Sequence, residues 1–85
     1  MSSVQVTVRY FAAAQAAVGT DSQQLSIGAG STVDDLVQRL GRGNGELARV
    51  LLRCSFLRDG VAIRDKAQAL EPGSTIDVLP PFAGG

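Results

Sequence analysis

Apolar and polar residues alternate strictly near the start of the chain. The apolar side chains occupy every second position, and they are Val4, Val6, Val8 and Tyr10. Because successive side chains of a strand point to opposite faces of a sheet, this period of two predicts a strand with one apolar face. The alanine-rich stretch 11–18 predicts a short helix that ends at Gly19, and residues 23–27 predict a second strand.

A helical spacing of apolar residues follows in the middle of the chain. The apolar positions recur at i, i+3, i+4 and i+7, and they are Val33, Leu36, Val37 and Leu40. Ser31 and Thr32 offer N-cap oxygens just before this stretch. Asp34 and Asp35 fit the positive end of the helix dipole, and as adjacent residues they point apart, so we expect cap charges and not a catalytic pair. The pattern predicts an amphipathic helix that packs one stripe onto the sheet.

Glycines at alternate positions predict where this helix stops. Gly41, Gly43 and Gly45 would each cost about 1 kcal/mol in a helix interior, so the helix should break there. A second, shorter helical piece is expected over 46–52, and its inward face is expected to carry Leu47, Val50 and Leu51.

The last third of the chain has the pattern of strands separated by turns. Residues 53–58 and 61–63 predict two strands that are joined by a tight turn at Asp59-Gly60, a strong hairpin signal. A Pro-Gly turn then leads into a last strand over 75–79. The element order is ββα(α)βββ, which predicts a single α+β domain with a helix across one face of its sheet.

Composition and charge narrow the classes of function. The chain has 85 residues, 45% of them hydrophobic, which is enough for one core. Eight basic residues balance eight acidic ones without a basic cluster, so nucleic acid is not an expected partner. We expect no membrane association and a cytoplasmic location, because there is neither a leader pattern nor a run of ~20 apolar residues. Histidine is absent and cysteine occurs once, so no bound metal or cofactor is expected.

The pattern ends abruptly after the last strand, at Pro80-Pro81-Phe82-Ala83-Gly84-Gly85. Prolines donate no ladder hydrogen bonds, so residues 80–85 are expected to form a flexible tail that leaves a domain over 1–79. Six residues at ~3.3 Å each reach roughly 20 Å, far enough to enter a neighbouring active site. The last two glycines lack a Cβ and suit a narrow channel. The terminal carboxylate of Gly85 is then the most accessible reactive group.

A free carboxylate needs chemical activation before it can donate its acyl group. With a pKa of ~3.5 it is ionised at pH 7 and is a poor electrophile, so a mixed anhydride with a nucleotide is required. No GxxxxGK loop is present, and another protein must therefore supply the ATP site. Two terminal glycines arise by chance in roughly 0.5% of chains. The adjoining prolines and Phe82 favour a functional tail over an ordinary chain end.

These segments resemble the MoaD-like branch of the ubiquitin-like β-grasp sulfur carriers, the small subunits of molybdopterin synthase, to which the thiamine sulfur carrier is related. The likeness runs along nearly the whole chain, in 6–12, 19–21, 32–36 and 78–85. The Pro-Pro-x-x-Gly-Gly ending is its most specific part. The resemblance implies a β-grasp fold, with a mixed sheet of about five strands and one main helix across one face.

The resemblance also implies a chemistry and two partners. An ATP-using activating enzyme, MoeB-like and with or without a rhodanese domain, would adenylate Gly85, and sulfur would replace one oxygen to give a thiocarboxylate. The tail would then insert into a MoaE-like large subunit of a heterotetrameric synthase, where two transfers build the dithiolene of molybdopterin from a cyclic pyranopterin monophosphate. Pro80, Pro81 and Phe82 are implied to line the partner groove. Ala83 and Gly84 are implied to bind the partner as well, and Gly84 keeps the tail narrow.

Two further side-chain predictions concern the strand at 53–58. Phe56 and Leu57 fall on opposite faces, so one of them is expected to join Leu79 in an apolar patch on the exposed side of the sheet. A patch continuous with the tail would be a docking surface. Cys54 is expected to be a small core residue, and the alternative is a reactive thiol assisted by nearby arginines.

Three other functions fit the same residues. The carrier would deliver sulfur to thiamine or cysteine biosynthesis, or an activated Gly85 would form an isopeptide bond as a ubiquitin-like modifier. A plain interaction module, in which the tail does nothing, is the third. Only the last of these tolerates loss of the free carboxylate.

Overall fold

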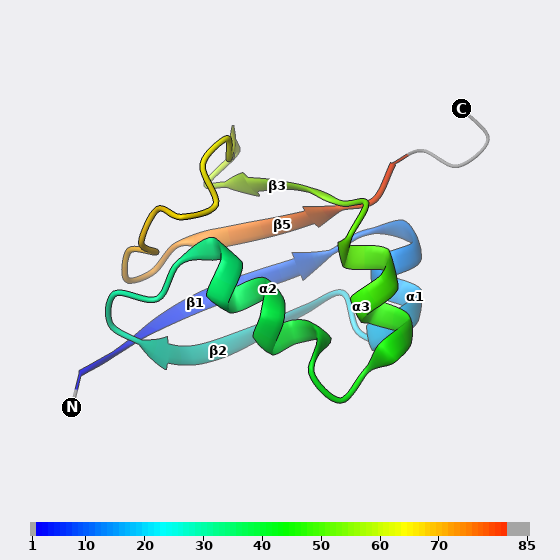
Figure 1. Ribbon diagram of the computed structural model, residues 1–85, viewed down its shortest axis with the longest axis horizontal. Coiled ribbons are helices and arrows are strands. Elements are labelled where there is room, and N and C mark those ends of the chain that lie inside the picture. The colour runs from blue at the N-terminus through cyan, green and yellow to red at the C-terminus, as the bar shows by residue number, and fades with distance from the viewer. Residues whose placement is uncertain (1, 82–85) are drawn as a thin grey trace.

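The sheet lies at the centre of the computed structural model, which describes residues 2–81 (Figure 1). Its strands within that range are β1 (Ser3–Tyr10), β2 (Ser22–Gly28), β3 (Ser55–Arg58), β4 (Val61–Ala62) and β5 (Thr75–Leu79). They lie in the order β2-β1-β5-β3-β4. The pair β1–β5 is parallel and the other neighbours are antiparallel. The last strand therefore sits in the middle of the sheet, beside the first.

The helices divide into one that crosses the sheet and two that gather at one end of it. They are α1 (Ala12–Val18), α2 (Val33–Gly41) and α3 (Gly45–Leu51). Figure 1 shows α2 across one face, and α1 and α3 at the end of the sheet where β1 and β5 finish. A mixed sheet that holds a helix across one face is the predicted β-grasp arrangement. In the part of the chain described, no helix has the length and apolar character needed to cross a membrane.

The core lies between the inner face of the sheet and the helices. Its fully buried members from the two central strands are Val6, Val8, Tyr10, Ile76 and Val78. Its buried members from the helices are Ala14, Val33, Leu36, Leu47 and Leu51. The alternation in β1 and the helical stripe in α2 thus face each other, as the two periodicities predicted.

A reciprocal pair of hydrogen bonds fixes the start of α2. The Thr32 hydroxyl accepts from the backbone N–H of Asp35 at 3.1 Å, and the Asp35 carboxylate accepts from the backbone N–H of Thr32 at 2.9 Å. Two N–H groups that a helix start leaves unpaired are satisfied in this way. The prediction that Asp34 and Asp35 are helix-start charges is confirmed.

Replacing Thr32 by alanine is expected to lower the free energy of unfolding by about 1 kcal/mol, because one of these two bonds is lost. Thr32→Ser keeps the hydroxyl and should stay within a few tenths of the wild-type value. Urea unfolding of the three proteins measures the difference. Equal stability of the alanine variant and the wild type would show that the capping box contributes nothing.

At two positions the local geometry explains why the residue is glycine. A Cβ at Gly41 would lie 3.1 Å from the Cβ of Ala48, so glycine lets α2 and α3 pack closely as well as ending the helix. In the β3–β4 turn, Asp59 and Gly60 both have positive φ, 49° and 85°. Positive φ at both central residues is the geometry of a type I′ hairpin turn, which the Asp-Gly signal predicted.

One predicted boundary is wrong by two residues. The strand expected over 53–58 begins only at Ser55. The backbone N–H groups of Arg53 and Cys54 donate to the carbonyls of Val50 and Leu51, at 3.0 and 3.2 Å. These bonds prolong the end of α3 as a turn, so the two residues are not free to join the sheet.

Candidate functional site

The chain leaves the sheet from its most enclosed position. β5 pairs with β1 on one side and β3 on the other, and it ends at Leu79. Pro80 is partly buried and Pro81 is exposed. The remaining predicted site residues, Phe82, Ala83, Gly84 and Gly85, lie outside the described residues. The described part of the site is therefore the surface from which the last residues depart.

The strand register decides which side chains share the open face of the sheet. Leu57 stands opposite Asp77 and Ser55 opposite Leu79, and cross-strand neighbours point to the same side. Leu57 and Leu79 thus share the open face, where both are half-buried.

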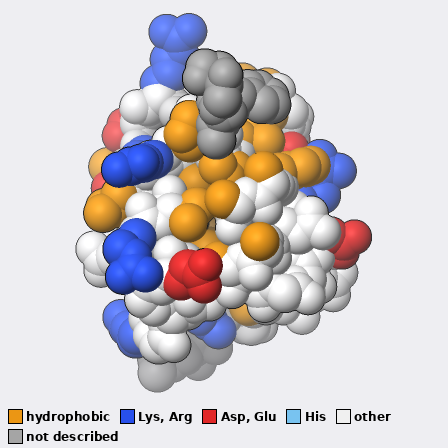
Figure 2. Space-filling model, turned by 90° about the vertical axis from the view of Figure 1, so that its right-hand side faces the viewer, with side chains coloured by type: hydrophobic (Ala, Val, Ile, Leu, Met, Phe, Trp, Pro, Cys, Tyr) orange, Lys and Arg blue, Asp and Glu red, His pale blue; other side chains and the backbone are white. Residues whose placement is uncertain are grey.

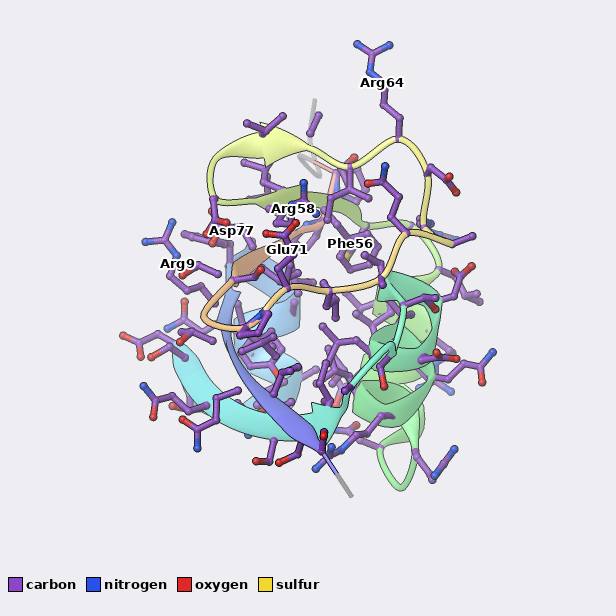
Figure 3. All side chains as sticks on the ribbon, turned by 90° about the vertical axis from the view of Figure 1, so that its left-hand side faces the viewer. Arg9, Phe56, Arg58, Arg64, Glu71 and Asp77 are labelled. Carbon is purple, nitrogen blue, oxygen red and sulfur yellow. The ribbon has the colours of Figure 1, made fainter. Side chains whose placement is uncertain are left out.

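Phe56 points the other way, into the core. It stands opposite Val78 and is only 3% exposed. Figure 3 shows Phe56 on the side of the helices, whereas Arg9 and Asp77 lie on the outer side of the sheet. This burial corrects the inclusion of Phe56 among the candidate partner-binding residues. Of the pair, Leu57 is the one that lies beside Leu79 on the open face.

An ion pair that the sequence did not reveal occupies the same open face. Arg9 Nε and Nη2 donate to the two carboxylate oxygens of Asp77 at 2.6 and 2.8 Å. Asp77 is only 5% exposed, and the Arg9 guanidinium also lies 5.6 Å from the ring centre of Phe11. The hydrogen bond and the charge of Asp77 raise the pKa of Arg9 above its ordinary value. A bidentate pair of this kind fixes both side chains in the middle of the face.

Cys54 lies in the core, as predicted. Its side chain is part of the buried cluster, and its thiol donates to the Val50 carbonyl at 3.3 Å. Burial raises the pKa of Cys54, an effect that the nearby charge of Lys66 partly offsets. A thiol with a raised pKa has little thiolate at neutral pH, so the geometry favours a structural role over a nucleophilic one.

Alkylation of the native protein by iodoacetamide at pH 8 is therefore expected to be at least about 10-fold slower than in guanidinium, because the thiol must first be exposed. Since folding raises the pKa, the native rate should keep increasing with pH beyond about 8.5, where an ordinary thiol levels off. Mass spectrometry of timed samples measures both rates. Equal rates in the native and unfolded protein would show that Cys54 is accessible and reactive.

The described residues around the chain exit supply apolar surface and no metal-binding cluster. Within residues 2–81, no three Asp, Glu, Cys or His side chains come together as a possible metal site. What the arrangement provides is a rigid central strand, two half-buried leucines and two prolines at the exit. Comparison with known proteins places this arrangement in a family.

The model of the ThiS family matches residues 8–85, which include the Gly-Gly ending. The chain belongs to the ThiS family. This membership confirms the resemblance to the sulfur-carrier branch of the β-grasp proteins that the sequence motifs indicated.

The chain is also similar to a named protein and to a solved structure. A molybdopterin synthase sulfur carrier subunit from Chlamydomonas reinhardtii is 28% identical over 83 residues, which cover 96% of this chain and 100% of that protein. The solution structure of the Haloferax volcanii HVO 2177 protein superposes with a TM-score of 0.86 at 28% identity, covering 98% of this chain and 88% of that one.

A solved complex adds a further relative. It contains subunits 1 and 2 of the molybdopterin-converting factor from Helicobacter pylori 26695, and its matching chain has a TM-score of 0.67 at 23% identity, covering 96% of this chain and 100% of that one. At that identity the likeness shows the fold alone, and with the Haloferax structure it confirms the ubiquitin-like β-grasp.

Proposed function

We propose that this chain is a sulfur carrier and the small subunit of a molybdopterin synthase, with the sulfur held as a thiocarboxylate on Gly85. The observation that carries the proposal is a family match that continues through Gly85. The full-length likeness to a molybdopterin synthase sulfur carrier subunit favours this pathway over thiamine or cysteine biosynthesis.

The proposed chemistry takes place in two steps. A carboxylate oxygen of Gly85 attacks the α-phosphorus of ATP and displaces pyrophosphate, which gives an acyl adenylate. A hydrosulfide equivalent then attacks the carbonyl carbon, and AMP leaves with the former carboxylate oxygen. The thiocarboxylate that results is a sulfur nucleophile. Both steps take place in the active site of an activating enzyme, MoeB-like, which supplies the nucleotide pocket.

The fold supports this role through the way it holds the base of the tail. β5 pairs with β1 on one side and β3 on the other, and its last residue, Leu79, still pairs with Ser55 of β3, so the base of the tail is anchored at the end of the central strand. Pro80 and Pro81 favour an extended course and donate no backbone hydrogen bond, so they direct the chain away from the ladder. A rigid base with a narrow Gly-Gly ending suits delivery of one reacting carbon into another protein.

The proposed receiver of the tail is a MoaE-like large synthase subunit. The Helicobacter pylori structure is titled as a complex of subunits 1 and 2 of the molybdopterin-converting factor, and its matching chain shares this fold. We propose that Leu57 and Leu79 contact the large subunit together with Pro80 and Pro81. The last four residues, 82–85, would enter its active site. The cytoplasm is the proposed location of these steps.

Intact-mass spectrometry tests the proposed function. The full chain is incubated with the activating enzyme of its own organism, ATP and a sulfur donor, and a parallel sample omits ATP. We expect the mass increase of one oxygen replaced by sulfur, located on Gly85, only in the complete mixture. An unchanged mass under conditions that convert a known carrier would contradict the proposal. Isopeptide adducts on lysines in cells would indicate the modifier function instead.

A further inference from the structure

A hollow lies where α1, α3 and the chain leaving β5 meet. It has a volume of about 550 Å³, and its apolar lining residues are Ala13, Val50, Leu52, Pro80 and Pro81. Figure 2 shows hydrophobic surface gathered at this end of the molecule, below the point where the chain departs, with both basic and acidic side chains around it. We refer to this hollow as the exit groove. It is separate from the open face of the sheet that carries Leu57.

Leu52 is the most prominent apolar side chain of the exit groove. It is 87% exposed, whereas Leu47 and Leu51 of the same helix are 3% exposed. The inward positions of α3 are filled by these two residues, and Leu52 follows as the C-cap that faces water. A single exposed leucine is ordinary, but this one lines the same hollow as the two prolines and Val50, so it belongs to a continuous apolar surface.

Two arginines complete the exit groove. Arg49 and Arg53 line it, and both are exposed. Within residues 2–81 the only salt bridge joins Arg9 to Asp77 on the open face, so the two groove arginines form none there. An apolar floor beside two positive charges is complementary to an apolar side chain flanked by carboxylates.

We propose that the exit groove docks an acidic segment of the large synthase subunit, with one large apolar side chain against Leu52 and carboxylates facing Arg49 and Arg53. This inference rests on the proposed function and adds a second contact to the one on the open face. Four residues beyond Pro81 span at most roughly 13 Å, so a protein that holds Gly85 in its active site must bring its surface close to the tail base. Pro80 and Pro81 belong to both the tail and the groove wall.

Isothermal titration of the full chain against the purified large subunit of the same organism tests the groove. Leu52→Glu is expected to weaken binding about 10-fold or more, because it places a charge at the centre of an apolar contact. Its matched control is Val61→Glu, a residue that is 70% exposed on β4 at the far edge of the sheet. The control should bind within about twofold of wild type.

The charge arm of the test compares Arg53→Glu and Arg49→Glu with Arg64→Glu, whose side chain projects away from the body of the protein (Figure 3). The two groove variants should weaken binding, and their affinity should fall less steeply with salt than that of the wild type. Arg64→Glu should leave affinity and salt dependence close to wild type. Thermal unfolding of each variant shows whether it is still folded. The milder substitution Leu52→Ala gives a second test of binding at the same position.

The outcomes separate the inference from the proposed function. If the wild type forms the thiocarboxylate and binds the large subunit, but all groove variants bind equally well, the exit groove is not a docking site and the proposed function stands. If the wild type neither gains sulfur nor binds the large subunit, both fail. Self-association of the chain that Leu52→Glu abolishes would make a second copy the occupant and overturn the inference.

Discussion

Deletion of Gly85 is expected to abolish sulfur transfer while leaving the fold intact. The deletion draws the reacting carboxyl carbon back by one residue, ~3.3 Å, from the position where it is activated. A misplacement of 1 Å already costs about 100-fold in well-oriented reactions, so we expect a loss of at least that size in thiocarboxylate formation. Initial rates with the activating enzyme measure it, and restoration of molybdenum cofactor synthesis in deficient cells gives a second readout.

Two further variants show why the chain that lacks Gly85 should be inactive. A chain with one residue added after Gly85 has no free carboxylate at that position and should be equally inactive. Gly85→Ala keeps the length and the carboxylate but adds a Cβ, so its rate should fall between those of the wild type and the deletion if the channel is narrow. Full activity of both the deletion and the extension would favour the plain interaction module.

Leu36→Ala is expected to cause one of the largest losses of stability of any single truncation in the chain. Leu36 is 1% exposed, and it lies on the stripe of α2 that faces the sheet. Truncation removes buried methyl groups and leaves a cavity, at a cost of about 2–5 kcal/mol. That is a large part of the ~5–15 kcal/mol that stabilises an ordinary domain. Urea unfolding followed by circular dichroism measures the change in midpoint at constant slope.

Leu52→Ala is the matched control, because it makes the same chemical change at an 87% exposed position. Its unfolding free energy should stay within about 0.5 kcal/mol of wild type. Equal losses for the two substitutions would contradict the packing of α2 on the sheet. A Leu52→Ala protein that is stable but binds the large subunit poorly would also support the exit groove as a docking site.

Local patterns predicted most of the secondary structure, because each depends only on residues close in sequence. The period of two in β1, the capped stripe of α2 and the Asp59-Gly60 turn all appear where they were expected. The strand start near Arg53 and Cys54 was wrong because the preceding helix end holds their N–H groups. That competition between neighbouring elements has no signature in either element alone.

The sequence did not reveal features that depend on how strands distant in the chain pair with each other. Arg9 and Asp77 are 68 positions apart and meet only because β5 pairs in parallel with β1. The choice between Phe56 and Leu57 likewise depended on which face of β3 meets the helices. The sequence signal for the ion pair is an opposite charge on the polar positions of two strands, which becomes specific only once the strand order is known.

The exit groove was also beyond sequence reasoning, since three segments distant in sequence build it. Leu52 in particular was expected at the end of a helical piece, with no indication that it faces water beside Pro81. The reacting end of the candidate site, in contrast to the exit groove, was predicted from the sequence. Gly85 emerged from the break in pattern after Leu79 and from the family resemblance, and its role remains a prediction.

Tracing labelled sulfur tests the central claim most directly. The thiocarboxylate form of the full chain, carrying isotopically labelled sulfur on Gly85, is mixed with the large subunit and the pyranopterin precursor. The account predicts that the label appears in the dithiolene of the pterin product and that the chain returns to its carboxylate mass. Label that stays on the chain, or a product formed with unlabelled sulfur from another source, would contradict it.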